Sequence, residues 1–325
     1  MDFFSHALLP YLLGNFFRRK KQHVTAFVLG GIAPDIDVFI MWINFVYPTF
    51  FLVTHRGLTH SLFFGFFTGF AVLYLASRAG IKNRLQRFFG LDAVVTPGAV
   101  LFAYAGVVLH LVLDYVTTRG VPLLFPFEVT RYSAEVFFYT DIYLTILSVI
   151  IIIALYKKLW QKNAVTGFLI LFLVAFALLG TVRMVEKTSA GDSIQGNDIN
   201  TYPTMNPFDW YILADDGENI KIYEYNGFSR TLPYNETTLK LYVAPGSENP
   251  DPGTALAIAG ELPQVKMFKW RAYDVAINAS FNDEKWLLQY YDPLQRAMIR
   301  DSPSVFRRIN SPLNVTVEGE RAFLS

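Results

Sequence analysis

The stretch that decides the fold is residues 57–77, GLTHSLFFGFFTGFAVLYLAS, in which His60 is the one side chain able to carry a charge. A helix needs roughly 20 predominantly apolar residues to cross the hydrocarbon core of a bilayer. Comparable apolar stretches occur at residues 24–47, 93–113, 136–156 and 163–182. The sequence therefore predicts an α-helical polytopic membrane domain of about five spans, preceded by a helix over 5–17 that is too short to cross.

The composition agrees with a membrane protein and excludes several other classes. Hydrophobic residues make up 53% of the chain and the mean hydropathy is +0.31, with the apolar content concentrated before residue 185. A net charge of +1 offers no broad positive potential for nucleic acid, so the expected partner is the lipid bilayer. The chain has no cysteine, which excludes disulfides and thiolate metal sites.

Basic residues predict the orientation of the chain in the membrane. They cluster between the apolar stretches at Arg18–Lys21, at Arg78, Lys82, Arg84 and Arg87, and at Lys157, Lys158 and Lys162. The positive-inside rule places these clusters in the cytoplasm. With five spans, everything after about Glu186 is then extracytoplasmic, and the protein is an integral protein of the cell membrane.

The composition changes near residue 187, where long apolar runs stop and Gly, Asp, Asn and Pro become common. We therefore divide the chain into a transmembrane domain over 1–186 and an extracytoplasmic β-rich domain over 187–325. Alternating residues on both sides of Asp215–Glu218 predict a hairpin. Further strands are expected over 266–277, 286–291 and 315–317, and this domain contains no recognisable catalytic cluster.

Ionisable residues inside the apolar stretches mark a candidate site, because such groups are costly in hydrocarbon and usually face a shared interior. His110 and Asp114 are four residues apart and share one face of a helix. Asp35 and Asp37 follow a helix-breaking proline, and two such carboxylates repel one another unless a cation neutralises them. The predicted topology brings these groups to a similar depth as His6 and the block His55-Arg-Gly-Leu-Thr-His60-Ser.

Together these residues predict a divalent metal site. The expected ligands, all nitrogen or oxygen donors, are His6, Asp35, Asp37, His55, His60, His110 and Asp114. Imidazole favours zinc, and the carboxylates are compatible with manganese or magnesium. For catalysis we expect Asp35 or Asp37 to act as ligand or general base and Arg56 to steady an anion.

The same residues are also compatible with roles that involve no metal. A buried histidine beside a carboxylate occurs as a packing device in membrane proteins, and an arginine such as Arg56 or Arg119 also neutralises a buried carboxylate. Arg56 is equally compatible with an interfacial position. His23 follows a basic cluster and is expected to be an ordinary interfacial residue.

The motifs resemble those of the YdjM-type family of membrane-bound, predicted metal-dependent hydrolases. The resemblance covers about residues 1–185, and its most specific part is the His-Arg-Gly-x-Thr-His-Ser block over 55–61. Also matching are Met-Asp-x-x-x-His at the start, the Gly-x-x-x-Pro-Asp-x-Asp stretch that runs from Gly30 or Gly31 to Asp37, and His110-x-x-x-Asp114. The family is distantly similar to zinc-dependent phospholipases C, and this similarity implies phosphoester hydrolysis.

The leading hypothesis is a membrane-embedded metal-dependent hydrolase that acts on a phosphoester, such as a lipid headgroup, near the outer leaflet. A second hypothesis is an ion-binding or transport protein, because a broken helix with carboxylates also suits ion translocation. A third is a structural or regulatory membrane protein in which a metal holds helices together and the C-terminal domain binds a partner.

Overall fold

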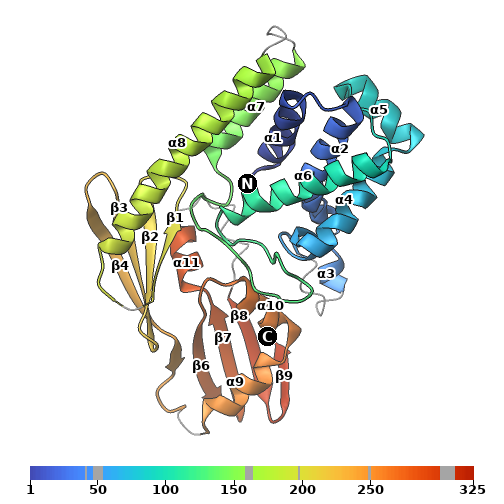
Figure 1. The fold of residues 1–325 in the computed structure, drawn as a ribbon. Coiled ribbons are helices and arrows are strands. Elements are labelled where there is room, and N and C mark those ends of the chain that lie inside the picture. The colour runs from blue at the N-terminus through green and yellow to red at the C-terminus, as the bar shows by residue number, and fades with distance from the viewer. Residues whose placement is uncertain (41, 47–53, 158–163, 197, 248–249, 301–311) are drawn as a thin grey trace. The chain divides into compact units, whose positions relative to one another are not determined.

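The structure, a computed structural model, describes residues 1–40, 42–46, 54–157, 164–196, 198–247, 250–300 and 312–325. The described chain divides into two compact units. The helical unit comprises the described residues up to Met184, and the β unit comprises those from Val185 onward (Figure 1). The first is helical and the second is built mainly from strands, as the change of composition predicts.

The helices of the first unit follow the apolar stretches of the sequence. They are α1 (Phe3–Phe16), α2 (Lys21–Ile32), α3 (Ile43–Val46), α4 (Leu62–Ala76), α5 (Ala79–Phe89), α6 (Pro97–Tyr115), α7 (Ile142–Tyr156) and the first part of α8 (Ala164–Asp192). Two short 3-10 helices, η1 (Pro34–Phe39) and η2 (Leu58–His60), interrupt the apolar stretches where the polar motifs lie.

Local signals set where these helices begin. The side chains of Asp2, Ser61, Thr96 and Asp141 each accept a backbone N–H bond at the first turn of α1, α4, α6 and α7 respectively. Such caps satisfy donors that have no partner within the helix. Pro34, which cannot continue an α-helical ladder, coincides with the change from α2 to η1.

Two helices, α6 and α8, are long and apolar enough to cross a membrane, and the bent pair α4 and α5 makes a third if it counts as one span. The axes of α4 and α5 differ by 85°. The apolar stretch predicted over 57–77 contains the 15-residue helix α4. This helix is shorter than the stretch because a turn and η2 occupy the first residues. Lys158, Lys162 and Asn163 lie outside the described residues.

Small residues allow α2 to approach both α1 and α6 very closely. A Cβ atom on Gly30 would lie 1.8 Å from the carbonyl oxygen of Ala103, and one on Gly106 would lie 2.2 Å from that of Phe27. A Cβ atom on Gly31 would lie 2.4 Å from the carbonyl oxygen of His6. Packing of this kind is typical of membrane helices, whose association depends on close backbone approach. It brings the polar motifs of α1 and α6 to the end of α2.

The β unit contains two sheets. The first has the order β1 (Ile199–Pro203), β2 (Asp209–Asp215), β3 (Asn219–Asn226), β4 (Thr231–Leu239), and all its pairs are antiparallel. The second has the order β5 (Leu241–Val243), β6 (Ala276–Asn282), β7 (Lys285–Tyr291), β8 (Leu313–Glu318), β9 (Arg321–Leu324), with one parallel pair, β5 and β6. The helices of this unit are α9 (Pro252–Gly260), α10 (Pro263–Arg271) and α11 (Pro293–Arg300).

The predicted hairpin and the strands over 286–291 and 315–317 are confirmed as β2–β3, β7 and β8. The prediction of one strand over 266–277 is wrong for its first part. Pro263 occupies the first turn of α10, which continues to Arg271, and β6 begins at Ala276. Proline is favoured at the first helical position because its fixed φ suits a helix and its missing N–H has no partner there.

Candidate metal centre

The predicted ligands come together at one end of the helical unit. His6 lies on α1, Asp35 and Asp37 on η1, His60 on η2, and His110 and Asp114 on α6. His6, His60, His110 and Asp114 have at most 1% of their surface exposed, whereas the side chains of Asp35 and His55 are 15% and 27% exposed. A buried set of imidazoles and carboxylates with one partly open side is the arrangement expected for a metal site.

The Nε2 atoms of His60 and His110 lie close to one another and to one carboxylate oxygen each of Asp35 and Asp114. His60 Nε2 lies 3.2 Å from His110 Nε2 and 3.5 Å from Asp35 Oδ1. His110 Nε2 lies 3.6 Å from Asp35 Oδ1, and Asp114 Oδ2 lies 3.5 Å from each of the two Nε2 atoms. Ligands about 2.0–2.2 Å from a tetrahedral zinc ion are themselves separated by about 3.3–3.6 Å. The distances from the two Nε2 atoms therefore match those between ligands of such an ion, and Asp35, His60 and His110 form one of the groups with metal-ligand spacing.

Hydrogen bonds orient both imidazoles of this set. His110 Nδ1–H donates to the carbonyl oxygen of Gly31 at 2.7 Å, and His60 Nδ1 lies 3.2 Å from Asp37 Oδ2. An imidazole that donates through Nδ1 keeps its Nε2 lone pair free, which is the usual state of a metal-binding histidine. The close packing of α2 against α1 and α6 thus helps to orient His110, because it places the Gly31 carbonyl oxygen within hydrogen-bond distance of His110 Nδ1.

Asp37 differs from Asp35 in what surrounds it. Its Oδ1 faces His55 Nδ1 at 2.9 Å, and its Oδ2 accepts bonds from the Arg56 backbone N–H at 3.2 Å and from Thr59 Oγ1 at 3.0 Å. With His60, these donors surround both oxygens of the carboxylate. Asp37 therefore orients the 55–60 segment, and it also belongs to a second group, with His55 and His60, that has the spacing of metal ligands.

Arg56 is almost fully buried and contacts Asp114. Its Nη2 donates to Asp114 Oδ1 at 2.9 Å, and its Nη1 donates to Thr117 Oγ1 and to the Thr118 carbonyl, both at 2.8 Å. The guanidinium also lies over the ring of Tyr139, 4.1 Å from its centroid. Arg56 thus neutralises the Asp114 oxygen that faces away from the two Nε2 atoms. Its predicted role toward a substrate anion stays a prediction.

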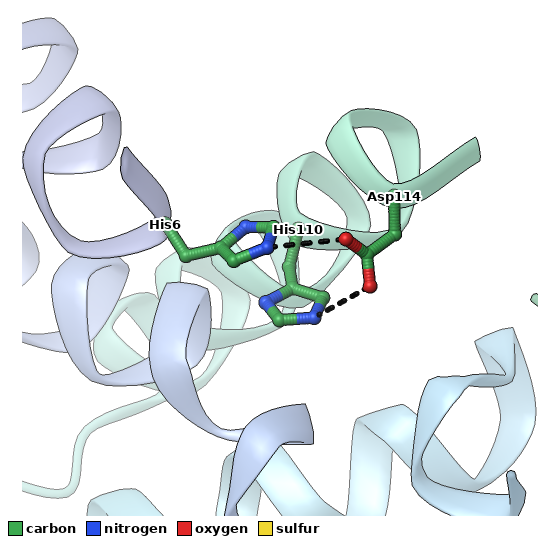
Figure 2. A group of neighbouring side chains, drawn as sticks. All are labelled: His6, His110 and Asp114. Carbon is green, nitrogen blue, oxygen red and sulfur yellow. Dashed lines mark hydrogen bonds and ion pairs between the residues drawn. The ribbon is translucent and has the colours of Figure 1, made fainter. Parts of the chain in front are cut away.

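His6 belongs to the same cluster through His110 and Asp114, as Figure 2 shows. The His6 and His110 rings stack with centroids 3.6 Å apart, and His6 Nε2 lies 3.3 Å from Asp114 Oδ1. That oxygen also accepts a bond from the α-amino group of Met1. His6 Nδ1 is buried with no hydrogen-bond partner among the described residues. The contact of His6 with the cluster is therefore through Nε2, on the side of the ring that faces Asp114.

Several contributors to the site carry no sequence signal that distinguishes them. Tyr139 and Thr117 contact Arg56, and neither lies in a predicted motif. Gly31 belongs to the stretch that leads to Asp37, but its carbonyl bond to His110 is not part of the prediction. Thr59 is part of the predicted block and bonds to Asp37. His23 lies outside the cluster, where its ring stacks on Phe102 with centroids 4.8 Å apart.

The YdjM inner membrane protein family matches residues 1–188, which cover the whole site and more than half of the chain. The chain therefore belongs to the YdjM inner membrane protein family, and the resemblance drawn from the motifs is confirmed. No curated protein and no solved structure matches the chain. The further similarity to phospholipases C stays a prediction.

Proposed function

We propose that this protein is a membrane-embedded metal-dependent hydrolase that acts on a phosphoester, such as a lipid headgroup, near the outer leaflet. The observation that carries the proposal is the donor set of His60, His110, Asp35 and Asp114. Its two imidazole nitrogens lie 3.2–3.6 Å from one another and from the carboxylate oxygens. Membership of an inner membrane protein family supports the location in the bilayer.

Zinc is the proposed ion because imidazole nitrogens contribute half of the four donors, and manganese or magnesium is the alternative because carboxylates contribute the rest. Such an ion acts as a Lewis acid that activates water and stabilises developing negative charge. In the described residues, the cations that contact the cluster, Arg56 and the α-amino group of Met1, are both paired with Asp114. Asp35 and Asp37 face imidazoles instead, so a divalent ion would supply their missing positive charge.

The residues of the chain have separate roles in this proposal. His60, His110, Asp35 and Asp114 hold the ion, with His6 beside them, and Asp37 orients His60. His55 is the side chain suited to exchange a proton with a substrate, because its Nδ1 is bonded to Asp37 and it is 27% exposed. The same exposure, together with that of Asp35, marks the side on which a headgroup enters.

The two ends of α6 support a location of the cluster near the outer leaflet. The basic residues of α5 come before α6, and His110 and Asp114 lie in its last two turns. Pro97 and Asp114 are separated by about 26 Å along an ideal helix, close to the thickness of a bilayer core. If the basic end is cytoplasmic, as the positive-inside rule favours, the cluster lies near the outer leaflet. Five spans and an extracytoplasmic β unit complete the proposed topology.

The first test is elemental analysis of the detergent-purified protein and of its His60→Ala and His23→Ala variants. We expect about one or two equivalents of a divalent metal in the wild type and in His23→Ala, and a large loss in His60→Ala. His23 is the matched control because its imidazole lies outside the cluster. A wild type without metal, or His60→Ala with full metal content, contradicts the proposal.

A second measurement separates metal binding from turnover. In His55→Ala we expect metal content close to that of the wild type and phosphoester hydrolysis reduced by about 100-fold or more, the range of a lost acid–base group. Loss of metal in His55→Ala would instead make His55 a ligand, as the sequence predicts.

A structural role for the ion is the second candidate function. The donors come from four separate elements, α1, η1, η2 and α6, so one ion would hold the polar ends of these segments together. Firmly bound metal with no hydrolysis of any phosphoester tested, including phospholipids, favours this role over catalysis.

A further inference from the structure

The second polar feature of the helical unit is α5, which lies at the end opposite the metal cluster. The loop that follows α5 is tied to the beginning of α2, because the backbone N–H of Asp92 donates to Thr25 Oγ1 at 2.9 Å. Leu85 of α5 packs against the core formed by α2, α4 and α6. Figure 1 shows α5 beside α2 and α4 within this unit. The position of α5 is therefore set by contacts with the membrane helices.

The axis of α5 turns 85° away from that of α4. If α4 crosses the bilayer beside α6, with which it packs, a helix at nearly a right angle to α4 runs close to the membrane plane. Gly90 ends α5 in the left-handed conformation, at φ 65°, and leads the chain back toward α6. The bend thus gives α5 the direction of an interfacial helix.

The surface of α5 is divided between apolar and basic side chains. Ile81, Leu85 and Phe88 recur at the i, i+4, i+7 spacing of one helix face. Ile81 is 46% exposed, Phe88 is 55% exposed and Phe89 is 66% exposed. Such large exposed apolar side chains on a helix that also carries cations are typical of helices that lie in the bilayer interface.

The basic residues of α5 flank this apolar face. On a helical projection Arg84 lies at one edge, Lys82 lies at the other, and Arg87 lies on the polar side. Lys82 pairs with Asp92 at 3.2 Å, whereas Arg84 and Arg87 are exposed. The basic segment Arg18–Lys21 lies just before Thr25, to which the α5 loop is bonded. The bond between the α5 loop and Thr25 thus brings two basic segments of the chain, Arg18–Lys21 and α5, to the same end of α2.

We propose that α5 lies in the plane of the membrane surface and binds anionic phospholipid headgroups. Its apolar face enters the boundary of the acyl chains, and Arg84 and Arg87 contact the headgroup phosphates. Charge complementarity selects an anionic lipid, since guanidinium groups bind phosphate in a bidentate manner. Lipid binding by α5 does not depend on the metal site, and the proposal would hold even if the protein had no hydrolase activity.

The first test measures the depth of α5 with spin labels. Because the native chain has no cysteine, Phe88→Cys and Asn83→Cys each place one nitroxide on the intact protein, on the apolar and polar faces respectively. In nanodiscs containing phosphatidylglycerol, we expect the label at 88 to be accessible to oxygen, which partitions into lipid. The label at 83 should be accessible to a water-soluble nickel chelate. Both labels in water, or a label at 88 shielded from both reagents, would overturn the proposal.

The second test measures lipid selectivity by native mass spectrometry of protein extracted from bilayers of equal parts phosphatidylglycerol and phosphatidylcholine. The wild type should retain phosphatidylglycerol preferentially, and Arg84→Gln with Arg87→Gln should lower that preference by about tenfold, since each basic residue near an anionic surface matters severalfold. The matched control, Lys221→Gln with Arg321→Gln, removes two charges from the β unit and should change nothing. Equal retention of both lipids by the wild type, or an equal loss in the control, contradicts headgroup binding by α5.

Discussion

The helical unit and the β unit use acidic residues in opposite ways. In the helical unit, Asp37 and Asp114 are at most 2% exposed, and each faces an imidazole from another segment of the chain. In the β unit, Asp215 and Asp216 lie at the β2–β3 turn and accept bonds from neighbouring backbone N–H groups. Asp215 and Asp216 shape a turn, and their lysine partners are partly exposed, whereas Asp37 and Asp114 are buried and need partners inside the protein. The comparison shows why the candidate chemistry lies in the helical unit.

The substitution with the largest expected effect on stability, Trp210→Ala, tests whether the two units are stable independently of one another. Trp210 is 1% exposed in the core of the first sheet, and its Nε1–H donates to the Pro207 carbonyl. Trp210→Ala should destabilise the β unit by about 3–5 kcal/mol, through lost burial and a residual cavity. Metal content should stay at the wild-type value, because the predicted ligands belong to the helical unit.

Thermal unfolding of the purified protein, followed by tryptophan fluorescence, measures this effect. Leu287→Ala, at a side chain that is 42% exposed, is the control and should change stability little. If Trp210→Ala also abolished metal binding, the separation of chemistry from the β unit would be wrong.

A smaller effect concerns the packing that brings the ligands together. A methyl group on Gly30 would overlap the Ala103 carbonyl oxygen, whereas the space around Gly167 is open within 4 Å. Gly30→Ala should therefore lower stability by about 1–3 kcal/mol, because the backbones of α2 and α6 must separate. It should also weaken metal binding, since Gly31 holds His110.

Gly167→Ala is the matched control and should be neutral or slightly stabilising, because alanine has the higher helix propensity. Thermal melting in detergent and metal titration measure the two variants side by side. Equal melting temperatures for both would show that the close approach of α2 and α6 does not matter.

How far the sequence predicts this molecule depends on whether the information is local. The apolar runs and the hairpin over 208–225 were predictable, because length and alternation are properties of neighbouring residues. The grouping of the candidate ligands was also predictable, because the predicted topology places them at a similar depth in the membrane. The different surroundings of Asp35 and Asp37 could not be predicted, because only one residue separates the two in sequence. Their contacts become different only when η1 and the 55–60 segment pack together. The direction of α5 was equally hidden, because residues 76–79 include no proline or glycine that would mark a break in the helix.

Asp37→Asn tests that difference between the two carboxylates. The amide has no negative charge, and its NH2 group is a donor. It therefore cannot replace the Asp37 carboxylate as the acceptor that orients the His60 imidazole through Nδ1. We expect divalent metal affinity to fall by about 10–100-fold, the usual effect of altering a group that orients a metal ligand. Isothermal titration of metal-stripped protein measures the change.

Asp216→Asn serves as the control, since its side chain is 43% exposed in the β unit. Complete loss of metal in Asp37→Asn would indicate that Asp37 is itself a ligand, in the group that it forms with His55 and His60.

The smallest effect concerns a partly buried ion pair of the β unit, Lys240 and Asp215. Lys240 Nζ donates to Asp215, and this bond lowers the pKa of the Asp215 carboxyl and raises the pKa of the Lys240 ammonium. A carboxyl with a lowered pKa stabilises the folded state above the pKa of the unfolded chain, about 3.9, and loses that contribution as the pH falls through the folded value. Lys240→Met should therefore cost at most about 1 kcal/mol near pH 7, and progressively less below about pH 4. Thermal melting between pH 3 and pH 7 measures the difference, with Lys266→Met, which removes a more exposed pair, as control. A penalty that grows as the pH falls would mean that the Lys240 side chain stabilises the unit through packing rather than through its charge.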